Sequence, residues 1–414
     1  VFSVLTVLYA YKITVKISNQ TNAFEVGLLL SVLWFMPWLG VRNLAEGVAI
    51  PFIMMGLWFL VEAPGRKHPV LTALCAGLIM GLAFSVRFQV SIFIGGAGLA
   101  LLLLKRWKEA FVFGFGALAS MLLVQGITDH FLWGKPFMEL GEYIRYNLEH
   151  KLEYGANHME MYFLVILGVL VPPMRILWFT GFFMGWRKHL LVFLPAFLFL
   201  AFHVYFPNKQ ERFVLTIVPL VLLLGVVGIN SFRQNSVFWN KHNTLFKRLY
   251  ASFWIINMVF LLVLTLTYSK RSRCESMYYA YKKSDANTIL VEHSYRTKTV
   301  TLPNFYAGKW VGIYNLPAYA DSVNPLLYNE YRRMNSHSKM LYSLEYFNLN
   351  PAEKKPGYIY FIGDTDLNQR IEMVQKYFGE IKPDTVVYPG FIDQMVGKLN
   401  PGNSSETIFI YKVL

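Results

Sequence analysis

The sequence predicts a polytopic α-helical membrane unit followed by a small water-soluble α/β domain. The chain is 55% hydrophobic and only 15% charged, whereas an ordinary soluble domain has about 25% charged residues. Residues 1–268 contain a series of apolar runs, each of about 17–20 residues, which is enough for a helix to cross a hydrocarbon core of about 30 Å. Residues 269–414 contain no such run. We therefore place the boundary between the two domains at residue 268.

The apolar runs of the first domain predict about ten membrane crossings. Val1 lies inside the first run, with no initiator methionine and no charged segment before it. A natural start or an intact signal peptide would have these features, so we expect a missing N-terminal piece. The runs lie near residues 1–17, 23–40, 44–61, 70–86, 88–104, 110–127, 161–181, 190–206, 213–231 and 250–268.

The gaps between the runs differ in charge, and this difference predicts the topology. One alternating set of gaps contains thirteen Lys and Arg residues, and the other set contains seven. Loops rich in Lys and Arg stay in the cytoplasm, so we assign the first set to that side. The second set, which includes an outer loop at 128–160, then faces the outside together with everything after Tyr268. The richer set comprises Lys12, Lys16, Arg66, Lys67, Lys105, Arg106, Lys108, Arg187, Lys188, Arg233, Lys241, Lys247 and Arg248.

Charge and cysteine content exclude several other classes. The formal net charge is +14, which in a soluble protein would suggest nucleic-acid binding. Here the cations lie in short clusters between apolar runs, so we interpret them as topology determinants and expect no nucleic-acid partner. Cys75 lies inside an apolar run and Cys274 follows the last one. We therefore expect neither a disulfide nor a metal site.

Long polar segments that resemble motifs occur only on the predicted outer side. The segment 128–160 combines Asp129 and five glutamates with Lys, Arg, Tyr, Trp and Phe. Its aromatic residues suit helices in the headgroup layer, and its charges suit a wet cleft facing them. The segment 206–213 is a very short hairpin with two cations and a carboxylate. Both segments also fit a plainer interpretation, in which they are interfacial loops with snorkelling side chains and no chemical role.

Two smaller polar clusters lie on the same side. Arg87 stands between two apolar runs with no other charge nearby, and Arg42 and Glu46 open another run. An arginine at the membrane centre costs about 2.5–3.5 kcal/mol on insertion scales, so Arg87 must lie at the interface or be paired in a cavity. Both locations remain open from the sequence.

Together these clusters indicate chemistry on a phosphorylated substrate. Cations can hold a phosphate through charge-assisted hydrogen bonds, and a carboxylate can take the proton of an attacking hydroxyl. A lipid-phosphate sugar meets both needs, because its phosphate lies at the headgroup level and its tail lies in the bilayer. This donor is a substrate, so no cofactor is expected. We assign phosphate binding to Arg42, Arg87, Lys209 and Arg212 and catalysis to Glu46 and Asp129.

The hairpin also carries a resemblance to a known family. Asn208-Lys-Gln-Glu-Arg-Phe213, followed by Pro219-Leu220, resembles the His-Lys-Glu-x-Arg-Phe…Pro-Leu signature of the dolichyl-phosphomannose-dependent alpha-mannosyltransferases. These enzymes have the GT-C fold and include the GPI-anchor and N-glycan precursor mannosyltransferases. Asn208 and Gln210 replace the usual His and Glu, so roles that need those two side chains are not implied here.

Other motifs follow in the family's order and extend the resemblance over roughly residues 20–230. They are Val41-Arg-Asn-Leu-Ala-Glu46, the Arg87 segment, Asp129-x-Phe131-x-x-Gly134-Lys135, and Tyr154-Gly155 with His158 and Tyr162. The family's acidic catalytic motif would lie upstream of Val1, so that carboxylate is not in this sequence. The resemblance implies substrate-binding roles for Lys135, Tyr154, His158, Tyr162 and Glu211.

The resemblance implies a multi-pass enzyme that moves a hexose, with mannose expected, from a polyprenyl-phosphate donor to a hydroxyl of a glycan or glycolipid. Its site would face the periplasm or exterior of a bacterial plasma membrane, or the lumen of the endoplasmic reticulum. The alternative is a transporter or flippase of lipid-linked sugars. Such a protein should show internal repeats and broken helices near the midplane, and the sequence shows no convincing repeat.

The C-terminal third predicts a small α/β unit on the outer side. Short β-like runs lie at 288–292 and 358–363, an amphipathic helix at 367–378, and strands at 385–388 and 407–414. Pro-Gly pairs separate several of these elements. Asn403-Ser-Ser405 fits a glycosylation sequon. A lid or acceptor-binding role and a structural cap both fit this domain.

Overall fold

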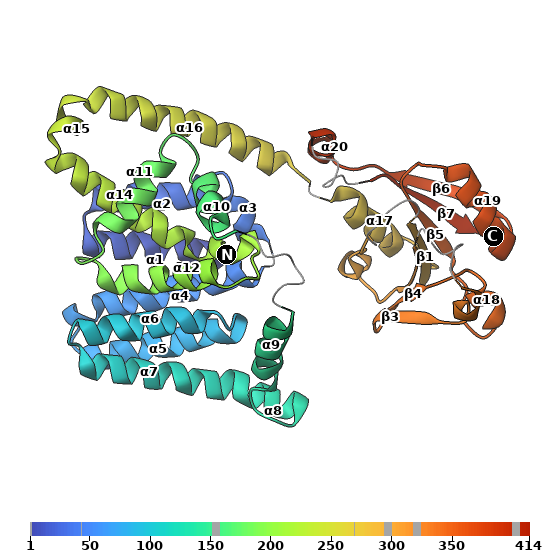
Figure 1. The fold of residues 1–414 in the computed structure, drawn as a ribbon, viewed down its shortest axis with the longest axis horizontal. Helices are drawn as coiled ribbons and strands as arrows, with labels where there is room; N and C mark the ends of the chain where they lie inside the picture. Colours follow the sequence, from blue (N-terminus) through green and yellow to red (C-terminus); the bar gives the residue numbers. More distant parts are fainter. Residues whose placement is uncertain are drawn as a thin grey trace. The chain divides into compact units, whose positions relative to one another are not determined.

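The computed structural model describes residues 2–42, 44–150, 158–268, 270–293, 300–317, 324–399 and 406–414. The chain divides into two compact units, Val1–Thr265 and Leu266–Leu414 (Figure 1). The division falls close to the boundary expected at residue 268. Each unit is described below by itself.

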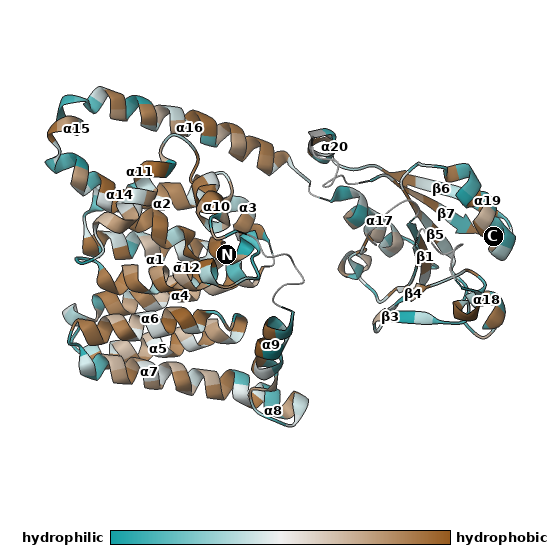
Figure 2. Cartoon of the chain, in the orientation of Figure 1, coloured by the Kyte–Doolittle hydropathy of each residue, from teal (hydrophilic) through white to brown (hydrophobic). Residues whose placement is uncertain are grey.

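The first unit is helical, and Figure 2 shows that most of its helices are apolar along their length and polar near their ends. Among the described residues, five helical segments are long and apolar enough to cross a membrane: Ala45–Gly65, Pro69–Val86, Trp107–Trp133, Glu211–Asn235 and the segment that begins at Asn243 and includes α16. Its helices are α1 (Phe2–Ile17), α2 (Gln20–Val32), α3 (Met36–Val41), α4 (Ala45–Glu62), α5 (Pro69–Val86), α6 (Val90–Leu103), α7 (Trp107–Met121), α8 (Ile127–Trp133), α9 (Met138–Glu149), α10 (Met161–Val169), α11 (Arg175–Met184), α12 (Leu190–Tyr205), α13 (Glu211–Val214), α14 (Val218–Asn235), α15 (Val237–Lys241) and α16 (Asn243–Leu266).

Helix α14 forms the centre of this unit. Its residues from Val218 to Asn230 are all buried, as expected for a helix that is apolar on every side. It packs tightly against α11, and a Cβ atom added at Gly228 would overlap the carbonyl oxygen of Gly181. The close approach of these two helices therefore requires glycine at the crossing point.

The second unit contains a seven-stranded sheet in the order β3-β4-β2-β1-β5-β7-β6. Strands β4, β2, β1 and β5 run parallel, and β3, β7 and β6 join antiparallel. Apolar clusters cover both faces of the sheet, which explains why β1 and β5 are wholly buried. Its elements are α17 (Arg271–Lys282), β1 (Thr288–His293), β2 (Gly312–Pro317), β3 (Tyr331–Asn335), β4 (Ser338–Leu341), α18 (Tyr346–Leu349), β5 (Tyr358–Ile362), α19 (Leu367–Phe378), β6 (Ile381–Val387), α20 (Phe391–Leu399) and β7 (Ile408–Val413).

The predicted α/β character of this unit is confirmed, although the sequence revealed only part of its sheet. The helix expected at 367–378 is α19, and the four expected strands correspond to β1, β5, β6 and β7. Strands β2, β3 and β4 were missed, because β2 ends at Pro317 and β3 is exposed along its whole length. Neither has the alternating or continuous apolar pattern of a core strand. The sequon at 403–405 lies outside the described residues.

Candidate active site at one end of the helical unit

A buried ion pair forms the base of the site. Glu46 lies in the first turn of α4, and Arg87 follows the last residue of α5. These two helices follow one another through a short turn at Ala63–Gly65 and pack together, so the start of α4 meets the end of α5. A carboxylate at a helix start and a cation at a helix end both suit the helix dipoles. Arg87 Nη1 pairs with Glu46 Oε1, and the two residues are only 7% and 1% exposed.

A second arginine approaches the same carboxylate from the hairpin before α14. Arg212 Nε lies 3.9 Å from Glu46 Oε1 and donates a hydrogen bond of 2.9 Å to Gln210 Oε1. The ring of Phe213 lies 5.1 Å from the Arg87 guanidinium and 5.7 Å from that of Arg212. One aromatic ring and one carboxylate therefore hold two guanidinium groups near each other.

These groups border a cavity of 530 Å³. Two donor atoms of Arg87, Nε and Nη2, are buried, and neither has a hydrogen-bond partner in the part of the chain that the structure describes. Buried polar groups are almost always paired, so unpartnered donors on a cation indicate a place for an anionic ligand. The lining residues are Leu44, Ala45, Glu46, Ser85, Val86, Arg87, Phe88, Gln89, Glu139, Tyr143, Tyr146, Asn147, Asn208, Gln210, Arg212 and Phe213.

Helix α9 supplies one wall of the cavity. Glu139, Tyr143, Tyr146 and Asn147 lie at helical spacing on one face of α9 and line the cavity. The Tyr143 hydroxyl accepts a hydrogen bond from Gln89 Nε2, and burial raises the pKa of Tyr143. Tyr143 therefore stays protonated at neutral pH and can act as a hydrogen-bond donor to a ligand.

Asp129 fixes the position of that wall. It is completely buried and accepts hydrogen bonds from Gln125 Nε2 at 2.9 Å and from the backbone N–H of Glu139 at 3.0 Å. Gln125 also donates to Glu139 Oε2 at 3.0 Å. Gln125 lies in a π-helical segment, Leu122–Gly126, a feature that occurs frequently at functional sites. Asp129 does not line the cavity, so it positions the start of α9.

The structure brings together only some of the cations assigned to phosphate binding. Arg87 and Arg212 line the cavity, whereas Lys209 and Arg42 do not. Lys209 is buried and donates to the carbonyl oxygen of Phe206 at 2.8 Å, and burial lowers the pKa of its amine. Arg42 lies over the ring of Trp38 at 4.8 Å.

The residues assigned to substrate binding by the resemblance are dispersed. Tyr162 is buried, and its hydroxyl accepts a hydrogen bond of 3.2 Å from the backbone N–H of Gln210. This hydrogen bond stabilises the hairpin. Lys135, His158 and Glu211 are exposed, and the lining does not include them. Tyr154 lies outside the described residues.

Asn208 is a lining residue that the sequence did not identify as a candidate. It is 6% exposed, and within the described ranges its side-chain oxygen has no hydrogen-bond partner. Its position in the hairpin that resembles the family signature could have identified it. It was not chosen because the family usually has a histidine at this position. Among the described residues, no group of three or more His, Cys, Asp or Glu side chains is placed to hold a metal ion.

The fold defines a polytopic α-helical protein, and its candidate site is a cavity with two arginines where several helix ends and the amphipathic helix α9 meet. The chain belongs to the Alg9-like mannosyltransferase family, whose model matches residues 1–301. This match extends beyond both ends of the segment on which the resemblance depended. It confirms the predicted membrane glycosyltransferase and its mannosyltransferase class.

Solved structures show the same fold. The chain is similar to ArnT from Cupriavidus metallidurans, with TM-scores of 0.63 for the crystal structure bound to undecaprenyl phosphate and 0.61 for the apo state. In both comparisons the identity is 9%, and the alignment covers 99% of this chain and 82% of ArnT. The predicted fold class, a GT-C-like membrane unit with a C-terminal α/β domain, is thereby confirmed. Compared with curated protein sequences, the chain shows no significant match.

Proposed function

We propose that the protein transfers mannose from a polyprenyl-phosphate donor to a hydroxyl of a glycan or glycolipid on the outer side of its membrane. The observation that carries this proposal is the buried Arg87 guanidinium, which presents two unpartnered donor atoms beside the cavity. A phosphate in the cavity would satisfy both donors. The solved ArnT structure with undecaprenyl phosphate supports a lipid of this chemical class as the donor.

The proposed arrangement follows from the lining. The donor phosphate binds between Arg87 and Arg212, which Glu46 and Phe213 hold near each other. The unpartnered oxygen of Asn208 accepts a hydrogen bond from a sugar hydroxyl. Since Glu46 is engaged by Arg87, its role is to fix the cations.

In the transfer step, the acceptor oxygen forms a bond with the anomeric carbon of the sugar, and the bond from that carbon to the phosphate oxygen breaks. The acceptor proton passes to a carboxylate acting as general base. The polyprenyl phosphate keeps the bonding electrons, and the two arginines stabilise the charge that develops on it. Lys209, Arg42 and the residues from the family resemblance remain candidates for contacts with the rest of the donor or the acceptor.

A direct test is a transfer assay on the full-length protein in detergent, with polyprenyl-phosphate mannose and the matching glucose donor supplied separately. We expect transfer from the mannose donor to a glycolipid acceptor, and faster transfer than from glucose. Equal rates for both sugars would contradict mannose specificity. Binding of the donor without any transfer, under conditions that support a related mannosyltransferase, would contradict the enzymatic proposal.

Replacing Arg212 with alanine should weaken use of the donor at least about tenfold, because a charge-assisted contact to phosphate contributes about 1.5–3 kcal/mol. Arg212 is half exposed, so the protein should still fold. Measuring kcat/KM for the donor checks this expectation, and Arg145→Ala, in the other outer segment, 128–160, and absent from the cavity lining, is the matched control. Unchanged kinetics in Arg212→Ala would remove Arg212 from the phosphate site.

Replacing Asp129 with asparagine should lower turnover about tenfold while the KM for the donor stays within about twofold, since one buried N–H loses its acceptor and this costs about 1–3 kcal/mol. The asparagine amide has the shape of the Asp129 carboxylate, but its NH₂ group replaces one oxygen that accepts a hydrogen bond from Gln125 or from the backbone N–H of Glu139. The arginines that hold the donor are on other elements, so donor binding should survive. Glu142→Gln on α9 is the control, because Glu142 pairs only with the exposed Arg145 among the described residues. A raised donor KM, or unchanged kinetics, would contradict this role.

The outer loop and the C-terminal domain should be accessible from the same side of the membrane, because the loop-charge pattern places both opposite the basic clusters. In a protein whose two native cysteines are replaced by serine, Leu140→Cys and Glu330→Cys should both react with an impermeant thiol reagent in sealed cells or right-side-out vesicles. Lys241→Cys, in a predicted cytoplasmic gap, should be protected. Opposite labelling of the first two positions would overturn the topology.

A further inference from the structure

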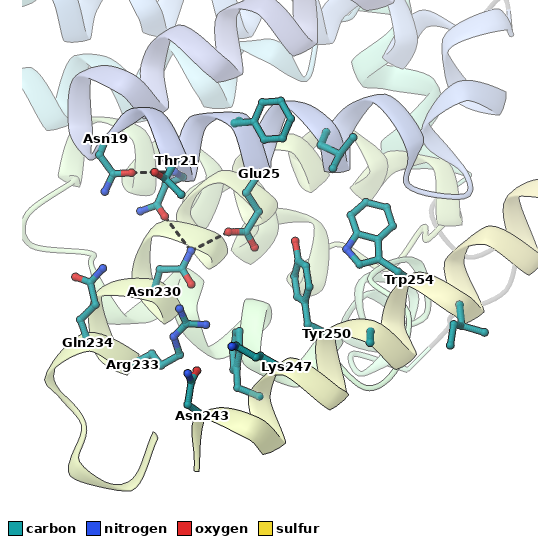
Figure 3. Close-up of a pocket in the computed structure, with 16 residues that line it drawn as sticks. Asn19, Thr21, Glu25, Asn230, Arg233, Gln234, Asn243, Lys247, Tyr250 and Trp254 are labelled. Atoms are coloured by element: carbon teal, nitrogen blue, oxygen red, sulfur yellow. Dashed lines mark hydrogen bonds between the residues drawn. The ribbon is translucent and has the colours of Figure 1, made fainter. Parts of the chain in front are cut away.

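A second cavity lies at the other end of the helical unit, between α2, α14 and α16 (Figure 3). Arg212 precedes α14 and Arg233 lies in its last turn, so the two cavities are separated by the length of that helix. The second cavity has a volume of 970 Å³, near the upper end of the usual range of about 300–1,000 Å³ for ligand pockets. It shares no lining residue with the candidate active site.

The lining changes from charged to apolar along the cavity. Arg233, in the last turn of α14, and Lys247, near the start of α16, lie at one end. From Lys247 to Ile255 the helix rises about 12 Å, and apolar residues line the cavity along this part of α16 and the facing part of α2. They are Phe24, Leu28, Ala251, Trp254 and Ile255. This gradient matches a molecule with an anionic head and an apolar tail.

The cavity is a fixed part of the fold, because α16 is held to the unit on both sides of it. Toward the end of α16, Asn257 accepts a hydrogen bond from the backbone N–H of Trp34 and donates one to the carbonyl oxygen of Val32, both at 2.8 Å. Near its start, the ring of Phe246 lies 4.2 Å from the Arg233 guanidinium. The cavity lies between these two points, with residues of α2, α14 and α16 in its lining.

Glu25, the acidic residue that lines the cavity, is hydrogen-bonded to another lining residue. Asn230 Nδ2 donates to Glu25 Oε2 and to Asn22 Oδ1, both at 2.9 Å, and the Tyr250 hydroxyl points toward Glu25 (Figure 3). Within the described ranges, no carboxylate lies within ion-pair distance of Arg233 or Lys247, although Arg233 lies close enough to Glu25 to attract its carboxylate. The two cations therefore remain available to an anion that enters the cavity.

We propose that this cavity binds an anionic glycerophospholipid, with its phosphate between Arg233 and Lys247 and an acyl chain along Phe24 and Trp254. The predicted topology places this end of the unit at the cytoplasmic leaflet, where anionic lipids are attracted to Lys and Arg near the surface. The apolar lining residues Phe24 and Ile255 are 68% and 67% exposed, and a lipid chain would cover them.

Native mass spectrometry of the full-length protein in detergent, with phosphatidylglycerol and phosphatidylcholine added in equal amounts, tests the proposal. We expect the wild-type protein to retain phosphatidylglycerol at least about tenfold more than phosphatidylcholine after collisional activation. The double variant Arg233→Gln/Lys247→Gln should lose this preference. Ala251→Phe, which fills the cavity but keeps both cations, should lose bound lipid as well.

The matched control is Lys105→Gln/Lys108→Gln, which removes two cations from another loop on the same predicted side and should retain the wild-type preference. Equal retention of both phospholipids by the wild-type protein, or unchanged preference in both cavity variants, would overturn the proposal. Stronger retention of undecaprenyl phosphate than of phosphatidylglycerol, abolished by the same substitutions, would also overturn it. The transfer assay tests the candidate active site, which shares no lining residue with this cavity. The lipid-binding proposal and the proposed mannosyl transfer can therefore fail independently.

Discussion

Replacing Arg87 with glutamine is expected to lower kcat/KM for the lipid-phosphate donor about 10²- to 10⁴-fold, because two charge-assisted hydrogen bonds of about 1.5–3 kcal/mol each would be lost. The guanidinium is 7% exposed, and its Nε and Nη2 atoms have no hydrogen-bond partner among the described residues. Glutamine cannot reproduce a forked cation. The measurement is donor-dependent transfer by purified protein, together with direct donor binding.

The same substitution takes from the buried Glu46 its closer partner and leaves only Arg212, at 3.9 Å. Breaking a buried ion pair in this way typically costs about 3–5 kcal/mol of stability. The double variant Arg87→Gln/Glu46→Gln removes both charges and should recover most of the thermal stability without recovering activity. Arg187→Gln, an exposed arginine at the opposite end of the unit, should behave as wild type. Substantial activity in a folded double variant would show that Arg87 does not bind the donor.

Replacing Arg370 with methionine is expected to destabilise the C-terminal domain by about 3–5 kcal/mol, since it breaks a buried ion pair by removing the cation. Arg370, on α19, pairs with Glu292 on β1, and the two side chains are 5% and 2% exposed. Its remaining N–H groups donate to carbonyl oxygens of Ile362, Gly363 and Thr365 at 3.0–3.1 Å. The arginine therefore joins a helix, a central strand and the end of a neighbouring strand.

Hydrogen exchange on the full-length protein measures this effect locally. Amides of β1 and β5 should exchange about 10²- to 10³-fold faster in Arg370→Met, whereas those of α14 should be unchanged. Arg332→Met, on the exposed strand β3, is the matched control. Pairing the substitution with Glu292→Leu should restore part of the protection. Wild-type exchange in Arg370→Met would show that the ion pair does not stabilise the sheet.

The class of protein could be predicted from the sequence, because membrane insertion depends on local properties. Hydropathy and run length indicated the helical unit, and loop charge predicted which helix ends share a side. The structure gathers segments from the predicted outer side around one cavity, including Glu46, Arg87, α9 and the hairpin before α14. The hairpin motif led to the family, since its residues are adjacent in the chain. In the C-terminal domain, continuous apolar runs predicted the buried strands, because such a run is also a local property of the sequence.

Only the tertiary structure decided which of the candidate residues face the cavity. Arg42, Arg87, Lys209 and Arg212 are equivalent by charge and predicted side, but side-chain direction separates them. Arg87 and Arg212 line the cavity, whereas Lys209 turns to a backbone carbonyl and Arg42 lies over an aromatic ring.

The roles of the carboxylates and of α9 also depend on contacts between segments far apart in the chain. Glu46 meets Arg87 because α4 and α5 are packed neighbours, and Asp129 meets the backbone of Glu139 because α9 folds back onto α8. Hydropathy and motif spacing report on each segment separately. The energy that selects one partner for a buried charge, in contrast, comes from desolvation and packing of the whole unit.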